Sequence, residues 1–353
     1  MNKNIILAFT LLIISLTTTC QYPVDVSELP DTEKFIFINA ELTETYAKVL
    51  VTYTLDDVTP EGAYVFPKPP TATAYVLDGN GNQFFFKTDG VIDTSFRGFV
   101  GQTYTLHVEV DGKTYESNAE TMRSCPELNT VTPIYTREPN RDAKDLLYDG
   151  FDVYVESLDP AGQDNYYQWD WVHYERSLSC AVMEENGREV LYPCTPYDCW
   201  NIRYNTRIIV QADRLRDGKS LTHRVVRVPF AVPPYKYYYL RVEQRAITPT
   251  VFAYLQSLET QTQNVGSVFD IPPQTRFSPN IYNVSNPTEK ILGVFNVFSS
   301  RHKIINIDIQ QEIPGIKPKN IGDPRPFTSI PLAQAKCVEG FHRTLIRPEG
   351  WVD

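Results

Sequence analysis

Cysteine offers the most distinctive chemistry in this sequence of 353 residues, which contains six of them. The first, Cys20, follows an apolar run from Ile5 to Leu16 and three threonines, with Lys3 as the only charge before it. A short apolar run behind a basic residue, closed by small side chains and Cys, is typical of a lipoprotein signal, although Leu16 lies one residue farther from Cys20 than is usual. We predict a signal peptide at residues 1–19 and a lipid on Cys20; the alternative is ordinary secretion.

Export to an oxidising compartment allows the other cysteines to form disulfides. Beyond Cys20 these are Cys125, Cys180, Cys194, Cys199 and Cys337. We predict that two of Cys180, Cys194 and Cys199 are bonded, because they lie close together in the sequence, and leave the pairing open. Zinc is the rival interpretation, but four residues separate Cys194 from Cys199 and no matching second pair follows, so we predict no metal.

Short catalytic motifs are missing from the sequence. It contains no HExxH pair, GxSxG elbow, GxxxxGK[ST] phosphate loop or GxGxxG fingerprint. Asp78, Asn80 and Asn82 alternate as in a calcium loop, but no bidentate Glu follows, so they predict a hairpin turn. We predict a protein that is not an enzyme and has no cofactor. A glycan-active hydrolase needs a pair of carboxylates, which leaves no short sequence motif. We therefore keep such a hydrolase as a third hypothesis, after two non-enzymatic binding roles.

Aromatic side chains, 12% of the sequence, are the better indication of function. In the segment YYQWDWVHY, alternation places Tyr167, Trp169, Trp171 and His173 on one face of a strand, which predicts that they are buried in a core. Tyr197 and Trp200 fall in a stretch rich in Cys, Pro and Asn, which predicts a loop. Because flat amphipathic rings suit sugars and protein partners, we predict Tyr197 and Trp200 as contact residues.

The elements that carry these residues are mostly strands. Period-two apolar runs between Gly, Asn and Asp turns predict a mainly β chain with two immunoglobulin- or fibronectin-like sandwich domains. The predicted organisation is a signal peptide at 1–19, an acidic tether at 20–34, a sandwich at 35–124, a second sandwich at 125–311 and a Pro-rich wrapping tail at 312–353. Thr248 as N-cap and Pro249 at the first helical position predict one helix near 249–262.

The net charge and the hydropathy of the sequence limit which partners and which kind of membrane attachment we expect. The formal net charge is −10 and Lys and Arg form no cluster, so we expect no nucleic-acid partner. No later segment has eighteen consecutive apolar residues, so we expect the mature chain to be held at a membrane by its lipid alone.

The order of several segments resembles domain-of-unknown-function family 4249, lipoproteins of Bacteroidota often encoded near TonB-dependent receptors. The segments are GFVGQTYTLHVEVDGKTYESNAETM from Gly98, YYQWDWVHYER from Tyr166, RVEQRAITPTVFAYLQSLETQ from Arg241, GSVFDIPPQTRFSPNIYNVSNPTEKILGVF from Gly266, and Cys337 before RPEGW. The family tail often carries a second Cys, whereas only Cys337 stands here, so a disulfide within the tail does not follow from the resemblance.

The resemblance implies an outer-membrane lipoprotein, anchored by its lipid and facing the cell exterior, beside a TonB-dependent barrel. It supplies no catalytic residues. We therefore predict a non-enzymatic accessory or ligand-binding component of a TonB-dependent uptake system, with a glycan, a peptide or another nutrient as ligand. The alternative is an envelope adhesion or structural binding module without a transport role.

Overall fold

A computed structural model of the chain describes the following residues: 34–54, 68–69, 71–92, 95–136, 150–176, 179–185, 188–195, 199–214, 216–229, 237–263, 276–313, 337 and 339–352. The predicted signal peptide, Cys20, all of the tether but Lys34, and most of the predicted tail therefore lie outside the described residues. The described strands and helices all belong to one compact unit, Phe35–Tyr53 with Lys68–Asp353. Several mostly antiparallel sheets and two helices in this unit confirm the prediction of a mainly β chain.

Two sheets share the first hydrophobic core. One has the order β18-β1-β19 with β2 on β1, and the other has the order β17-β6-β5-β3-β4 with β7 on β5. The strands are β1 Ile36–Leu42, β2 Ala47–Tyr53, β3 Ala72–Asp78, β4 Gln83–Phe85, β5 Thr103–Val110, β6 Lys113–Ser117, β7 Glu120–Thr121, β17 Ile281–Asn283, β18 Ile291–Leu292 and β19 Phe295–Val297. Alternate residues of β1 and β5 enter this core, as the period-two sequence pattern requires.

Strands from far along the chain complete these two sheets. β18 and β19 pair in parallel with β1, and β17 pairs with β6. Gly293, between β18 and β19, has φ +96°, and a Cβ there would clash with the carbonyl oxygen of Ile38, so this close approach requires glycine. Residues 281–297, which the sequence placed in the second sandwich, thus belong to the sheets of the first core.

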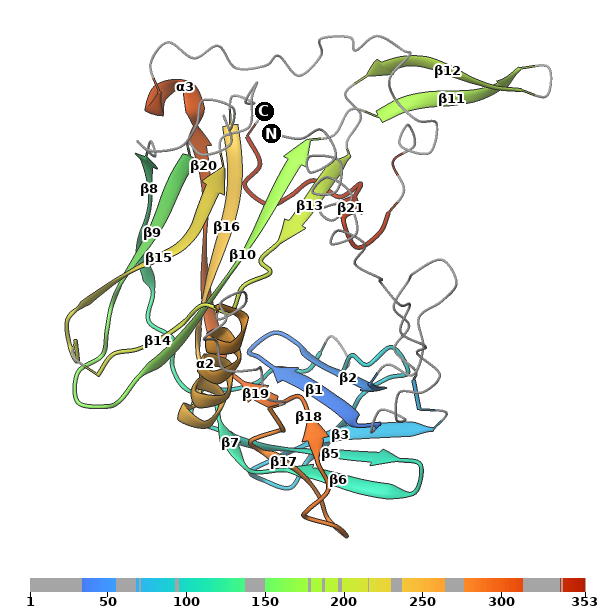
Figure 1. Cartoon of the computed structure of the whole chain (residues 1–353), viewed down its shortest axis with the longest axis vertical. Coiled ribbons are helices and arrows are strands. Elements are labelled where there is room, and N and C mark those ends of the chain that lie inside the picture. The colour runs from blue at the N-terminus through green and yellow to red at the C-terminus, as the bar shows by residue number, and fades with distance from the viewer. Residues whose placement is uncertain are drawn as a thin grey trace, which may run out of the picture. The chain divides into compact units, whose positions relative to one another are not determined.

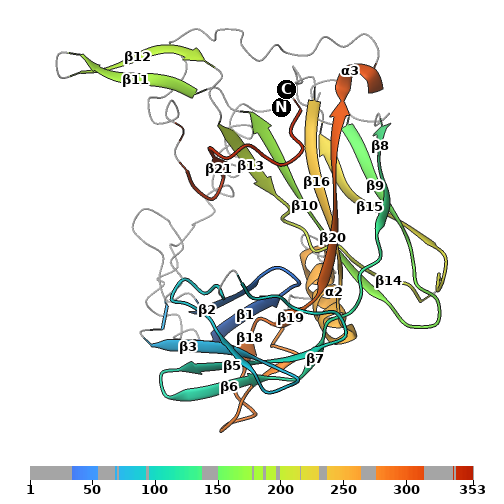
Figure 2. The same cartoon turned by 180° about the vertical axis from the view of Figure 1, so that it is seen from behind.

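A second pair of sheets holds the remaining long strands, and Figures 1 and 2 show it from opposite sides. One sheet has the order β20-β16-β10-β13-β21 with β14 on β10, and the other has the order β15-β9-β8. The strands are β8 Leu128–Thr136, β9 Gly150–Leu158, β10 Tyr166–Arg176, β13 Trp200–Tyr204, β14 Val210–Ala212, β15 Ser220–Pro229, β16 Tyr237–Ala246, β20 Ser299–Asp308 and β21 Arg343–Thr344. A hairpin of β11 Ser179–Glu185 and β12 Arg188–Thr195 forms a separate sheet.

The core between these sheets explains the aromatic density of the sequence. Tyr167, Trp169 and His173 of β10 are buried, which confirms the prediction for these three side chains, whereas Trp171 is only partly buried. Trp169 donates a hydrogen bond from Nε1 to Oε1 of Gln244 at 3.1 Å. The polar end of the indole is therefore satisfied inside the core.

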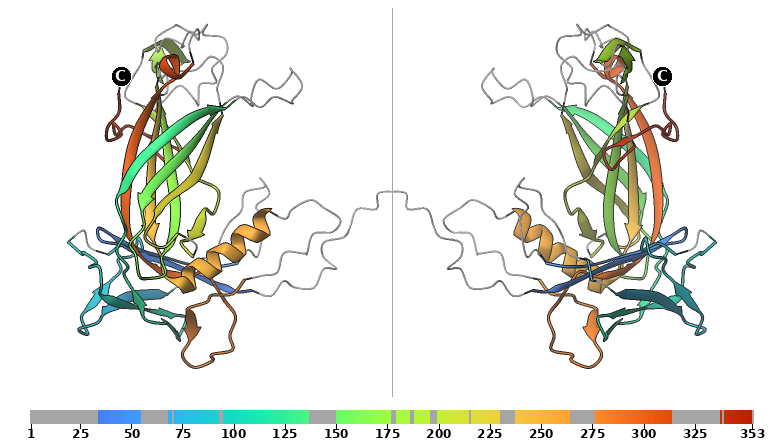
Figure 3. Two further views of the ribbon diagram at one scale, coloured as in Figure 1. Left: turned by 90° about the vertical axis from the view of Figure 1, so that its left-hand side faces the viewer. Right: turned by 90° about the vertical axis from the view of Figure 1, so that its right-hand side faces the viewer.

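Helix α2, Pro249–Gln263, follows β16 and covers a third cluster of apolar residues. The hydroxyl of Thr248 accepts a hydrogen bond from the amide of Val251, as expected of an N-cap. The helix contacts β10 and β14, and its position is clearest in Figure 3. The other described helix, α3, is a single turn at Ile309–Glu312. Among the described residues, neither helix is long and apolar enough to cross a bilayer.

Candidate functional site

A hollow that combines charged and aromatic side chains lies beside β15, one of the two edge strands of the described β15-β9-β8 sheet. We call it the β15 cavity. Its volume is about 730 Å³, within the range of small-molecule sites. It is lined by Trp171, residues 205–209, residues 223–227, Glu259 and Thr262.

A β-bulge in β15 places the charged residues of this cavity. The register against β9 shifts between Arg224 and Val226, so one extra residue, Val225, enters the core. A bulge of this kind redirects the side chains on either side of it. Arg224 and Arg227 both reach the carboxylate of Asp152, with their Nη1 atoms 3.1 and 3.2 Å from its two oxygens.

The turn between β13 and β14 supplies a third arginine. The side chain of Asn205 accepts a hydrogen bond from the amide of Arg207 at 3.0 Å and donates one to its carbonyl oxygen at 2.7 Å. The amide of Asn205 in turn bonds the carbonyl oxygen of Trp171 at 3.0 Å. Arg207 is thereby held at the cavity, and its exposed side chain makes no ion pair with any side chain that the structure describes.

Electrostatically, the β15 cavity is basic in an acidic protein. Among the described residues that line it are three arginines and a single carboxylate, Glu259. His223 adds no charge at neutral pH, because its burial and the nearby Arg224 lower the pKa of the imidazole. The ring of His223 stacks on Trp169, with centroids 4.7 Å apart, which fixes its orientation. Such an arrangement attracts anions.

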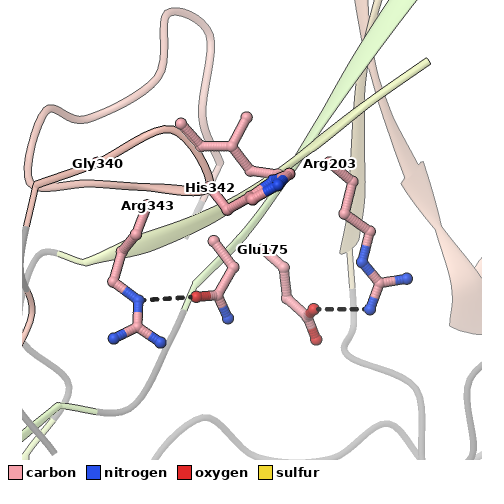
Figure 4. A pocket seen from close by; sticks show the side chains of 7 residues that line it. Glu175, Arg203, Gly340, His342 and Arg343 are labelled. Carbon is pink, nitrogen blue, oxygen red and sulfur yellow. Dashed lines mark hydrogen bonds and ion pairs between the residues drawn. The ribbon is translucent and has the colours of Figure 1, made fainter. Parts of the chain in front are cut away.

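A second, more open hollow of about 480 Å³ lies at β21, and we call it the β21 pocket (Figure 4). Arg203 lies 3.7 Å from Glu175, and Nε of Arg343 donates to Asn201 at 3.2 Å. Gly340, Ile202 and His342 complete the lining. Both arginines therefore have polar partners from the protein itself.

Two aromatic residues, Tyr204 and Phe341, are chain neighbours of residues that line the β21 pocket. The Phe341 ring is 72% exposed and lies against Tyr204, with centroids 4.8 Å apart. Phe341, which belongs to the predicted tail, is one of the most exposed large apolar residues described.

The disulfide in the described structure joins β13 to the tail. Cys199 is bonded to Cys337, with a Cα–Cα distance of 6.0 Å and a sequence separation of 138. Cys199 is one of the three cysteines among which the sequence predicts a bond without fixing the pair, and its partner Cys337 lies outside that group. Cys180 and Cys194 are direct cross-strand partners in the backbone register of β11 and β12, and their side chains lie outside the described part of the structure.

Cys125 is a free thiol in the described structure, and it is buried. Its Sγ donates to the carbonyl oxygen of Gln244 at 3.3 Å. Burial raises the pKa of the thiol to about 12, so it is protonated and unreactive in the folded protein.

The structure describes one of the two predicted contact residues, Trp200. Tyr197 lies outside the described residues. Trp200 begins β13 and is 1% exposed, so its ring is not accessible to a ligand in this structure. It packs edge-on against Trp351, with centroids 6.0 Å apart, because the tail folds back over β13. The residues of the β15 cavity went unpredicted, because the two arginines of the segment HRVVR, residues 223–227, do not form a basic cluster in the sequence.

Three carboxylates lie close enough to share a cation: Asp159, Asp213 and Asp217. Their oxygens already accept hydrogen bonds from the protein, among them the Tyr167 hydroxyl at 2.6 Å from Asp159 and the Asn165 amide at 2.9 Å from Asp213. Burial and the neighbouring Asp213 raise the pKa of Asp159 despite these hydrogen bonds. Proximity of carboxylates alone does not define a metal site, and none is assigned.

The hairpin prediction at Asp78 agrees with the structure. Asp78 ends β3, and its carboxylate accepts hydrogen bonds from the amides of Asn80 and Asn82 at 2.9 and 2.8 Å. The Asn82 side chain, whose Nδ2 donates to the same carboxylate at 2.9 Å, and these two amides keep the pKa of Asp78 below its usual value. The carboxylate thus stabilises the β3–β4 turn.

Fold and site together describe a mainly β protein with a basic, ligand-sized cavity. The family described as domain of unknown function (DUF4249) matches residues 21–304, and the chain belongs to this family. None of the curated proteins compared with the chain matches it.

Proposed function

We propose that this protein is an outer-membrane lipoprotein that acts as a non-enzymatic, ligand-binding accessory of a TonB-dependent uptake system. In this proposal Cys20 carries the lipid, the chain faces the cell exterior and a TonB-dependent barrel is its partner. Each pair of sheets is an immunoglobulin- or fibronectin-like sandwich, and the Pro-rich tail wraps the second one.

The β15 cavity is the observation that carries a binding role. It has the volume of a small-molecule site, and its lining combines an aromatic ring with charged groups held on strands and a hydrogen-bonded turn. A site held on such a rigid scaffold needs little reordering when a ligand binds. The lipoprotein-like signal and the family membership support the envelope location.

The composition of the cavity favours binding over hydrolysis. Glycoside hydrolysis uses two carboxyl groups about 5 to 10 Å apart. Among the described residues that line the cavity, Glu259 is the single carboxylate. No serine or cysteine nucleophile stands in this described lining either. The hydrolase hypothesis therefore gains no support from this site.

Co-purification tests the accessory role against the alternative, an adhesion or structural module. The tagged full-length protein is extracted from its native membrane in mild detergent, beside a Cys20→Ala variant that cannot be lipidated. We expect a TonB-dependent barrel with the wild type and much less of it with the variant. Recovery of the lipidated protein without a barrel would contradict the transport role and leave the adhesion module.

A further inference from the structure

The charge balance of the β15 cavity opposes that of the whole protein. The chain has a net charge of −10, yet the part of the cavity lining that the structure describes contains three arginines and one carboxylate. Asp152 compensates part of this charge, since it pairs with Arg224 and Arg227 from beneath. Arg207 has no such acidic partner among the described side chains, so a net positive charge remains at the cavity.

The arginines keep donors available for a ligand. A guanidinium has five N–H groups, and the ion pair of Arg224 with Asp152 is made through Nη1. The Arg224 side chain is 53% exposed, so its remaining donors face solvent, and the Arg207 side chain is exposed as well. Guanidinium groups bind carboxylate and phosphate oxygens with paired hydrogen bonds, which are stronger than neutral ones.

Apolar surface lies beside these donors. Trp171 packs with one part against the core and lines the cavity with another. Ile208 and Ile209 come from the same turn as Arg207. A flat aromatic side chain next to a cation suits a ring that carries an anionic group, because the ring packs on the indole while its charge meets the arginine.

We propose that the β15 cavity binds a small organic anion, with Arg207 and Arg224 holding its carboxylate or phosphate and Trp171 contacting its ring. This names the ligand class of the site on which the proposed function rests. The bulge at Val225 is the structural device that brings Arg224 and Arg227 to Asp152, and Asp152 keeps Arg224 at the cavity.

Calorimetric titration of the full-length protein in detergent tests the proposal with two matched pairs of probes. Trigalacturonate and its methyl ester differ in carboxylate charge, and glucose 6-phosphate and glucose differ in phosphate charge. We expect at least one charged probe to bind about tenfold or more tightly than its neutral counterpart. Its affinity should fall as NaCl is raised from about 0.05 to 0.5 M. The pair that responds distinguishes a carboxylate ligand from a phosphate ligand.

Two variants and a matched control locate the binding. Arg224→Gln and Arg207→Gln should each weaken binding of the charged probe by about tenfold or more, and Arg203→Gln in the β21 pocket should not. Arg207→Gln keeps the test valid if loss of the Asp152 pair disturbs folding. Equal affinity for charged and neutral probes, no binding of either charged probe, or equal weakening by Arg203→Gln would overturn the proposal. Co-purification with a barrel tests the accessory role, whereas the titrations test anion binding by the cavity, so each proposal can fail while the other holds.

Discussion

Removal of the Cys199–Cys337 disulfide should destabilise the second pair of sheets. The bond closes a loop with a sequence separation of 138, and chain-entropy reasoning gives a loop of this length about 5 kcal/mol near room temperature. This is an upper value, because a compact unfolded chain has less entropy to lose. With a urea m-value of about 3 kcal/mol/M, the upper end of the range for small proteins, a loss of this size lowers the urea midpoint by roughly 1.7 M.

The tail has contacts of its own that should keep it docked in the native state. The hydroxyl of Tyr239 donates to the carbonyl oxygen of Glu349 at 2.9 Å, and Trp351 stacks on Tyr239 with centroids 5.9 Å apart. Thr344 pairs with Trp200 in the β13–β21 ladder. We therefore expect the bond to act mainly on the unfolded chain.

Urea unfolding followed by tryptophan fluorescence measures this effect, because Trp200 and Trp351 lie beside the bond and change environment when the tail leaves β13. The Cys199→Ala, Cys337→Ala double variant is compared with the wild type, and Cys125→Ser serves as a cysteine control outside the bond. The double variant should unfold at a clearly lower urea concentration. If both proteins share one midpoint, the reasoning from loop closure is refuted.

Three further perturbations have definite expected results. Burial lowers the pKa of the His173 imidazole to about 4, below the unfolded value of 6.5. Between these values the unfolded chain binds a proton that the folded protein does not. The contribution of His173 to the free energy of unfolding should therefore be constant above pH 6.5 and fall by up to about 3 kcal/mol as the pH drops to 4. A His173→Gln variant whose unfolding shows the same pH slope would contradict this. The Arg245 side chain is 11% exposed and pairs with Glu243 at 2.8 Å. Arg245→Met leaves a buried carboxylate and should lower the free energy of unfolding, measured by chemical denaturation, by about 3–5 kcal/mol. A loss below about 1 kcal/mol would contradict this expectation. Maleimide should label Cys125 in urea and not in the native protein, and rapid native labelling of this thiol would show that it is accessible.

Local pattern was enough to predict strands such as β10 and the start of α2, but not β13, which begins at Trp200 within the stretch predicted as a loop. The alternation in YYQWDWVHY gave the inward face of β10, and Thr248-Pro249 gave the start of α2, because both signals act within a few residues. Trp171 is the exception on that face. It is only partly buried, and part of its side chain lines the β15 cavity.

Partners far apart in the sequence were not predictable. β18 and β19 have two and three residues, too few for a periodic signal, and their pairing with β1 depends on tertiary contacts such as the close approach at Gly293. The same holds for Cys199, whose partner lies in the tail. The β15 cavity combines a bulge, a turn and a helix end, and neither a bulge nor a turn conformation can be inferred from charge spacing alone.

Chemical crosslinking in living cells tests the central claim, an accessory of a TonB-dependent transporter, most directly. The tagged full-length protein and its Cys20→Ala variant are crosslinked in the intact envelope, purified under denaturing conditions and identified by mass spectrometry with their neighbours. The account predicts a TonB-dependent barrel as the main crosslinked neighbour of the wild type, and its loss from the variant. A wild-type protein crosslinked only to itself or to unrelated envelope proteins would contradict it.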